Sequence, residues 1–286
     1  MPLLIPPELQ SNCQLEPGRA AWLRRLEPTV QLLARQWALT LQPPFPEATA
    51  AWAAPVTRAD GTSAVLKLGM PHLEADHEAE GLAFWDGDPT VYLLASDPSH
   101  GAMLLERCEP GLPLRSLPEP EQDAVIAQLL RRLWRPVGSH WPFRPLSAML
   151  AYWAAEAERD RATWVDPALV QDGLRLYAQL SPAHADDVLL ATDLHAGNVL
   201  RAQRAEWLAI DPKPFVGDRA YDATQHLLNC RERLLREPGD TVARIADLLE
   251  VPAERVRLWT FARLAVESRR PLAHAAAAAL ARVLAR

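Results

Sequence analysis

The spacing of apolar residues changes near residue 110, and this change constrains the fold more than any other feature of the sequence. Before it, short apolar runs alternate with turn residues, which is typical of strands; after it, apolar residues recur at helical spacing. The predicted strands span residues 48–56, 63–68, 91–95 and 102–108, and a helix is predicted between the pairs, at 73–85. The predicted helices beyond residue 110 begin with 119–134, 145–159 and 167–180. The sequence therefore predicts an α+β protein with a small antiparallel sheet and a larger, mainly helical part.

These two parts predict two lobes, residues 1–108 and 109–286. The first lobe has an N-terminal extension over 17–39, which is an amphipathic helix or a helix pair broken near Pro28. In the second lobe, short apolar segments interrupt the helices at residues 188–191, 199–200 and 207–210. Helical spacing resumes at Asp218 and continues to the end.

Charge and cysteine content restrict the partners. Formal net charge is −6 and no long basic run is present, so we expect no nucleic acid and favour a small or cationic ligand. The three cysteines have no paired spacing, which predicts buried, reduced thiols. The segment Met1–Gln10 does not resemble a secretory signal, and the apolar stretch 272–285 is shorter than the roughly 20 residues of a membrane span. We therefore expect a cytoplasmic protein without a membrane partner.

Lysine is nearly absent from this chain. Among 30 basic residues only Lys67 and Lys213 are lysines, and the others are arginines. A compact ammonium differs chemically from a guanidinium fork, so a chain that otherwise uses arginine would keep lysine where that ammonium is needed. The alternative is a compositional bias with two accidental lysines. Lys67 lies on the second strand of a predicted hairpin that turns at Asp60-Gly61.

The strongest local pattern is the segment DLHAGN, which begins at Asp193 and ends at Asn198, followed by Asp211 after an apolar strand. Phosphoryl transfer requires a carboxylate that orients the attacking hydroxyl, and oxygen ligands that hold magnesium against the phosphates. An Asp and an Asn five residues apart, as in kinase catalytic loops, supply these groups together with a second Asp. Taken alone, Asp193 and Asn198 also fit a turn cap and a left-handed turn position.

Nearby polar residues have structural interpretations. We interpret His195 as a buried, hydrogen-bonded loop residue and not as a catalytic base. Lys213 is either a substrate or phosphate contact or a solvated loop charge. Asp218 and Asp222 are predicted to hold the catalytic loop through its backbone N–H groups and to cap the next helix.

The segments DLHAGNVL (193–200) and WLAIDPKPFVGDRAYD (207–222) together resemble the aminoglycoside phosphotransferases of the kinase-like superfamily. The Asp-Pro-Lys-Pro element within the second segment resembles most the branch that contains streptomycin 6-phosphotransferases and hydroxyurea phosphotransferases. The resemblance extends less sharply to DGTSAVLKL, HEAEGL and LLERCEPG, and covers approximately residues 50–230.

This resemblance implies a two-lobe, protein-kinase-like fold and transfer of the γ-phosphoryl group of ATP to a hydroxyl of an aminoglycoside, most of all a streptomycin-like one. Such an activity would inactivate the antibiotic. By the resemblance, Asp193 is the catalytic carboxylate, and Asn198 and Asp211 bind Mg²⁺. ATP and Mg²⁺ are the implied nucleotide and cofactor.

The resemblance also assigns nucleotide-binding residues in the first lobe. Lys67 would reach the α- and β-phosphates, and Glu78 on the following helix would hold its ammonium. Glu74 and Glu80 are competing partners, and Glu78 is preferred. The peptide groups from Glu106 to Cys108, at the exit of the last strand, would meet the adenine edge.

Three alternatives stay open. Many members of the wider family have His-Gly before the catalytic Asp, whereas this chain has Ala191-Thr192, which is compatible with a nucleotide-binding relative that lacks activity. A metal-dependent hydrolase is a rival from another class, although it gives Lys67 no role. Its ligands would come from Asp193, His195, Asp211, His184 and His226. Within the kinase hypothesis, hydroxyurea and an aminosugar are alternative acceptors.

Overall fold

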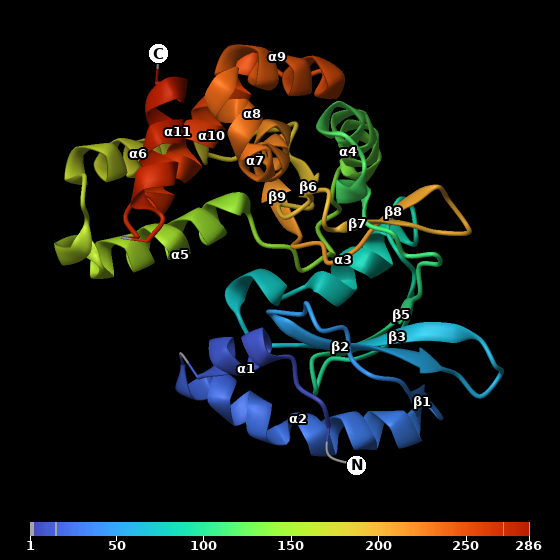
Figure 1. The fold of residues 1–286 in the computed structure, drawn as a ribbon. Coiled ribbons are helices and arrows are strands. Elements are labelled where there is room, and N and C mark those ends of the chain that lie inside the picture. Colours follow the sequence, from blue (N-terminus) through green and yellow to red (C-terminus); the bar gives the residue numbers. More distant parts are fainter. Residues whose placement is uncertain (1–2, 15, 271, 286) are drawn as a thin grey trace. The chain divides into compact units, whose positions relative to one another are not determined.

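The fold is that of a computed structural model, which describes residues 3–14, 16–270 and 272–285. The chain forms two compact units (Figure 1). The first extends to Gly111 and also includes Arg201–Leu208, while the second comprises Leu112–Leu200 and the chain from Ala209 onward. A short segment from the second half of the sequence therefore belongs to the first unit.

The first unit is built on an antiparallel sheet with the strand order β1-β2-β3-β5-β4. Its strands are β1 Thr40–Leu41, β2 Ala51–Thr57, β3 Ser63–Gly69, β4 Leu93–Asp97 and β5 Ala102–Glu106. The β2–β3 turn is fixed by Asp60, whose carboxylate accepts hydrogen bonds from the backbone and hydroxyl of Thr62, and by Gly61 at φ +83°. Four of the five strands were predicted; β1 is only two residues long and depends on its pairing with β2.

Helices cover both faces of this sheet (Figure 1). The helices α1 Pro7–Cys13 and α2 Pro17–Gln36 pack on one face, where Leu26 and Val30 form a buried core with β-strand side chains. On β3, Ala64, Leu66 and Leu68 point into this core. Because side chains alternate along a strand, Lys67 points to the opposite face, where α3 Glu78–Trp85 lies.

The structure decides one open helix prediction and changes another. Of the two alternatives for the N-terminal extension, the single helix is correct, because α2 is continuous through Pro28. The predicted helix 73–85 is divided into a 3₁₀ turn, Leu73–Ala75, and α3. The division occurs because His77 adopts a left-handed conformation with φ +69°, which a regular helix does not tolerate. The helix therefore begins at Glu78.

The second unit is mainly helical. Its helices are α4 Glu119–Leu133, α5 Leu146–Arg159, α6 Pro167–Leu180, α7 Arg219–Asn229, α8 Arg231–Arg236, α9 Pro238–Leu249, α10 Ala253–Glu267 and α11 His274–Leu284. The helix α10 packs against α6, α7, α9 and α11, and its Trp259 is fully buried. Gly173 allows α6 to approach α10 closely, because a Cβ at this position would lie 2.8 Å from the Cβ of Ala265.

Short strands frame the loops of the second half. The strands β6 Val188–Leu190 and β9 Phe215–Gly217 pair antiparallel, and β7 Val199–Arg201 pairs with β8 Trp207–Ala209. The last of these strands in sequence, β9, was not predicted. The pairing of β6 with β9 brings the residues that follow Leu190 next to the residues that precede Phe215.

A buried charge cluster joins α4 to α7, α8 and α9. The carboxylate of Asp123 is fully buried and accepts two hydrogen bonds from Arg233, at 2.6 and 2.7 Å, one from Arg244 at 2.9 Å, and one from Nε2 of His226 at 2.8 Å. Burial alone would raise the pKa of Asp123, but these donors hold it well below its usual range. Asp123 is therefore ionised and compensated.

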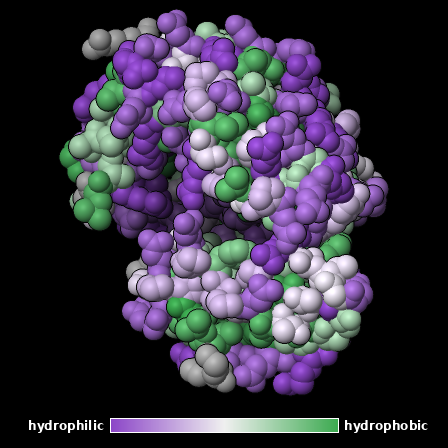
Figure 2. All heavy atoms as spheres, turned by 45° about the vertical axis from the view of Figure 1, so that its right-hand side comes forward, coloured by the Kyte–Doolittle hydropathy of each residue, from purple (hydrophilic) through white to green (hydrophobic). Residues whose placement is uncertain are grey.

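Hydrophilic side chains cover much of the face shown in Figure 2. No helix in the described ranges has the length and apolar character needed to cross a membrane. Cys13, Cys108 and Cys230 are free and buried, as predicted.

Candidate active site

In the first unit, Lys67 and Glu78 form a buried ion pair. The ammonium of Lys67 lies 2.5 and 2.7 Å from the two carboxylate oxygens of Glu78. Lys67 is 9% exposed and Glu78 is 3% exposed, so solvent screens this pair weakly. Glu78, the partner that the family resemblance implies, is thus bonded to Lys67.

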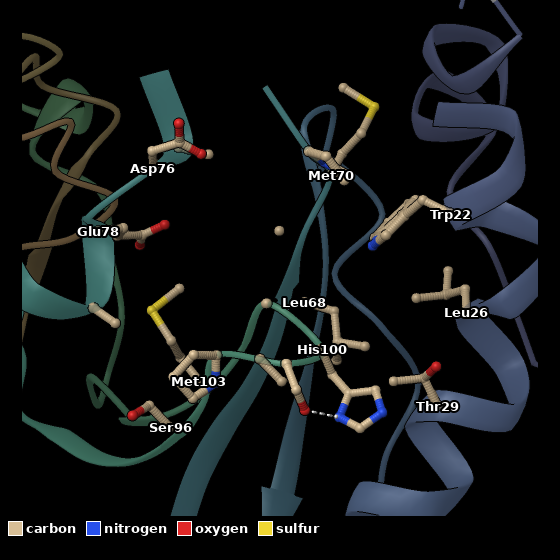
Figure 3. A pocket seen from close by; sticks show the side chains of 18 of the residues that line it. Trp22, Leu26, Thr29, Leu68, Met70, Asp76, Glu78, Ser96, His100 and Met103 are labelled. Carbon is tan, nitrogen blue, oxygen red and sulfur yellow. Dashed lines mark hydrogen bonds between the residues drawn. The ribbon is translucent and has the colours of Figure 1, made fainter. Parts of the chain in front are cut away.

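A cavity of about 810 Å³ lies beside the start of α3. Asp76 and Glu78 lie on one side of it, and Trp22 and Leu26 of α2 lie on the opposite side (Figure 3). The first turn of α3 therefore borders open space on the side that faces α2.

The exit of β5 is held by an arginine that the sequence did not single out. Nε and Nη2 of Arg204 donate to the carboxylate of Glu106 at 3.0 and 2.9 Å, and its guanidinium lies 4.2 Å from the ring centroid of Tyr92. Hydrogen bonds to the backbone of Gly87 and Thr90 complete the contact. The side chain of Glu106 is therefore structural. Burial raises the pKa of the Cys108 thiol to about 12, so it is not a nucleophile.

In the second unit, the loop that follows β6 carries Asp193 and Asn198. The side-chain amide of Asn198 donates to the backbone carbonyl of Asp193 at 3.1 Å, and its backbone N–H donates to the carbonyl of His195 at 2.8 Å. The backbone N–H of Ile210 donates to the Asn198 carbonyl at 2.9 Å. This bond places Asp211, the next residue, beside the same loop.

The buried carboxylate of Asp222 holds the beginning of this loop. It accepts hydrogen bonds from the backbone N–H groups of Ala191 at 3.0 Å and Thr192 at 2.7 Å, and from the indole of Trp134 at 3.0 Å. Burial raises the pKa of Asp222 to about 6, although the three donors act in the opposite direction. Asp218 caps α7 through the backbone N–H of Ala220. Both structural interpretations of these aspartates agree with the structure.

Two residues of the site have positive φ angles, Thr192 at +49° and Asp211 at +53°. Left-handed backbone is unfavourable for such residues and persists where surrounding contacts hold it. The hydroxyl of Thr192 donates to the carbonyl of Lys213 at 2.6 Å, and the backbone N–H of Lys213 donates to the carbonyl of Ala191 at 2.8 Å. These bonds tie the two strained segments to each other.

The lysine of the Asp-Pro-Lys-Pro element is buried. Lys213 is 6% exposed, and its ammonium donates to Oδ1 of Asp211 at 2.8 Å. It is therefore not a solvated loop charge. Its positive charge compensates part of the carboxylate charge at this end of the site.

The hydrogen bond of His195 lies within the loop and is structural. Its Nδ1 accepts a hydrogen bond from the backbone N–H of Gly197 at 3.0 Å. Burial lowers the pKa of His195, although the nearby charge of Asp211 opposes this effect. A neutral ring with Nδ1 as acceptor supports the loop, which agrees with the structural interpretation of this residue.

The carboxylate of Asp193 has a side-chain partner that sequence reasoning missed. Nε2 of Gln225, on α7, donates to Oδ1 of Asp193 at 2.7 Å. The two residues are 32 positions apart, and a glutamine on a helix carries no recognisable pattern. Only the packing of α7 against the loop reveals this contact.

The oxygen donors of the site fit magnesium. Since the amide nitrogen of Asn198 is used by the loop, its side-chain oxygen is the atom that can act as a ligand. Together with the Asp211 carboxylate it supplies the hard oxygen ligands that Mg²⁺ prefers. The hydrolase alternative finds no such support. Within the described part of the chain, the one group of three ligating side chains is Asp123, His226 and Cys230, and Asp123 is already saturated by arginines.

The fold is kinase-like, as two solved structures of low sequence identity show. Choline kinase LicA from Streptococcus pneumoniae has a similar structure, with a TM-score of 0.61 and 11% identity, over 88% of this chain and 98% of that chain. Macrolide 2'-phosphotransferase MphH from Brachybacterium faecium aligns with a TM-score of 0.56 and 17% identity, over 88% and 97% of the two chains.

Sequence comparison gives the particular family. Residues 36–273 match the family described as aminoglycoside/hydroxyurea antibiotic resistance kinase, and the chain belongs to this family. Streptomycin 6-kinase from Streptomyces glaucescens is 36% identical over 255 residues, which cover 85% of this chain and 82% of the relative. Hydroxyurea phosphotransferase from Kitasatospora aureofaciens is 35% identical, over 91% of this chain and 78% of the relative. The protein is accordingly a phosphotransferase of the kinase type.

Proposed function

We propose that this protein transfers the γ-phosphoryl group of ATP to a hydroxyl of an aminoglycoside of the streptomycin type. Two relatives named streptomycin 6-kinase, each 36% identical to this chain, support this acceptor. The net charge of −6 is compatible with a cationic acceptor. Such a reaction would inactivate the antibiotic and would take place where ATP is available, in the cytoplasm.

One observation carries the proposal: a single tethered loop presents Asp193 and Asn198, and a backbone hydrogen bond attaches Asp211 to it. In the proposed reaction, Asp193 orients the acceptor hydroxyl and accepts its proton as the oxygen attacks the γ-phosphorus. A new oxygen–phosphorus bond forms, the bond between the γ-phosphorus and the bridging oxygen breaks, and ADP leaves. Asn198 and Asp211 would hold Mg²⁺, which neutralises phosphate charge when it is bound.

The lobe predicted over residues 1–108, which forms most of the first unit, would bind the nucleotide. Lys67 would contact the α- and β-phosphates, and Glu78 keeps its ammonium in a defined position. Peptide groups between Glu106 and Cys108 would bind the adenine edge. The lobe predicted over residues 109–286, which contains the second unit, would bind the acceptor.

A second candidate acceptor is hydroxyurea, which is favoured by the relative named hydroxyurea phosphotransferase at 35% identity. Its terminal N–OH group is a hydroxyl that the same chemistry could phosphorylate. An aminosugar is a third candidate. A small neutral acceptor would need fewer carboxylates in the acceptor pocket than an aminoglycoside.

The test is an ATP-consumption screen with streptomycin, other aminoglycosides, hydroxyurea and aminosugars, followed by mass spectrometry of the product. We expect turnover with streptomycin and a product heavier by one phosphoryl group. The Asp193→Ala protein, which retains Lys67 and its partner, should bind nucleotide but give no product. Turnover with metal and water in the absence of nucleotide would contradict the proposal and favour a hydrolase.

A further inference from the structure

Gln225, on α7, contacts the carboxylate of Asp193. It lies three residues after Asp222, whose carboxylate holds the backbone of the loop. Nε2 of Gln225 lies 2.7 Å from Oδ1 of Asp193. A short hydrogen bond from a neutral amide restricts rotation of the carboxylate without neutralising its charge. A lysine or arginine at this position would hold the carboxylate equally well but would reduce its basicity.

Arg263, on α10, fixes the orientation of this amide. Its Nη2 donates to Oε1 of Gln225 at 2.6 Å, and its Nη1 donates to the hydroxyl of Thr224 at 2.6 Å. A guanidinium can only donate hydrogen bonds, so the oxygen of the amide must face Arg263. The amide nitrogen must then face Asp193. The usual ambiguity between the two ends of a glutamine side chain is therefore resolved by its partners.

Aromatic rings hold the guanidinium of Arg263 in turn. It lies 5.2 Å from the ring centroid of Tyr221 and 5.7 Å from that of Trp153. Contacts of this kind stabilise a guanidinium and fix its plane. The chain of contacts thus runs from a packed aromatic environment, through Arg263 and Gln225, to Asp193.

We propose that Gln225 is a positioning residue for the carboxylate of Asp193, and that Arg263 acts through Gln225 by fixing its amide with the nitrogen toward Asp193. This inference rests on the proposed function, in which Asp193 orients the acceptor hydroxyl. Its requirement is geometric: the carboxylate must meet the hydroxyl in one orientation, and the hydrogen bond from Gln225 favours that orientation over others. Neither Gln225 nor Arg263 needs to touch the acceptor or the nucleotide.

The first test replaces the amide. Gln225→Leu keeps a side chain of similar length without a donor, and we expect kcat to fall roughly 100-fold, the effect of a misplaced reacting group. The KM for ATP should not change, because the nucleotide contacts are elsewhere. Gln225→Asn keeps the amide but shortens its reach, and should also lower kcat. The matched control is Gln179→Leu on the exposed surface of α6, which should leave kcat unchanged.

The second test asks whether Arg263 acts through Gln225. Arg263→Met should lower kcat less than Gln225→Leu does, because the released amide still donates to Asp193 in one of its two orientations. In the Gln225→Leu background, Arg263→Met should have no further effect on kcat, since coupled residues are not additive. Independent, multiplicative effects would overturn the inference for Arg263.

The Asp193→Ala protein separates this inference from the proposed function. If Asp193→Ala retains wild-type turnover, the proposed role of Asp193 is wrong. If Asp193→Ala is inactive while folded Gln225→Leu and Gln225→Asn have wild-type kcat, the proposed function stands and the positioning role is overturned. If kcat falls only in proportion to a loss of folded protein, measured by circular dichroism, Gln225 is a structural residue and the inference is also overturned. A lower kcat in fully folded protein with unchanged ATP KM supports it.

Discussion

The substitution Asp222→Ala tests whether a buried carboxylate anchors the candidate catalytic loop. Asp222 is 1% exposed and accepts hydrogen bonds from the backbone of Ala191 and Thr192 and from the indole of Trp134. The substitution leaves three donors without their acceptor. Each such donor costs about 1–3 kcal/mol when it stays buried.

A second effect reduces the loss of stability caused by Asp222→Ala at neutral pH. Burial raises the pKa of Asp222 from 3.8 to about 6, so at pH 7 the folded protein holds an ionised carboxylate that it disfavours. The shift of about two pH units corresponds to about 3 kcal/mol, which the substitution to alanine relieves. The lost hydrogen bonds, about 6 kcal/mol together, exceed this relief. We expect a net destabilisation of about 3 kcal/mol at pH 7.

The pH dependence has a definite sign. Because the folded pKa lies above the unfolded value, the contribution of Asp222 to stability is fully present below about pH 4 and is lost as the pH rises through about 6. The cost of Asp222→Ala should therefore grow as the pH falls from 7 toward 4.5, by about 2 kcal/mol. An aspartate stabilised by a salt bridge would show the opposite trend.

The measurement is denaturant unfolding of the wild type and Asp222→Ala, followed by tryptophan fluorescence at pH 7 and 4.5. Asp172→Ala, which removes an exposed aspartate of α6, is the control and should change stability by less than about 0.5 kcal/mol at either pH. A cost that stays constant or shrinks at low pH would refute the argument that burial dominates at Asp222. A cost below about 1 kcal/mol at both pH values would refute the anchoring role itself.

Two further substitutions probe the other buried charges. Glu78→Gln removes the charge that holds Lys67, so we expect the KM for ATP to rise roughly tenfold with little change in folding. Steady-state kinetics and nucleotide titration measure this effect. An unchanged KM for ATP would contradict the nucleotide role of this pair. Asp123→Ala leaves two arginines and His226 uncompensated and should lower stability by about 3–5 kcal/mol. Since the pKa of Asp123 is held below its usual range, the wild-type contribution is present above about pH 4 and is lost below it, so the cost of this substitution should shrink in acid. A cost that increases in acid would contradict this assignment.

The sequence predicts a candidate site where the pattern of residues is local. Asp193, Asn198 and Asp211 were proposed because five- and thirteen-residue spacings place them on one loop and directly after the next apolar strand. Lys67 was proposed because lysine is rare in this chain. Arginine cannot be singled out in this way, because the sequence contains 28 arginines. Nothing in the composition therefore indicated Arg204 or Arg263. Their roles depend on partners such as Glu106, which lies 98 residues from Arg204.

The elements that the sequence missed are those whose stability is not local. A strand of two or three residues, such as β1 or β9, buries too little surface to be recognised by periodicity, and it exists because a partner strand supplies its hydrogen bonds. The pairing of β9 with β6 matters most for function, since it brings the Lys213 segment against Ala191 and allows Asp222 to reach the loop. Short sequence motifs therefore indicate which residue types form the candidate site. Their positions in space depend on contacts between segments that are distant in sequence. For this reason Asp193 could be proposed from a spacing, whereas the glutamine that contacts its carboxylate could not.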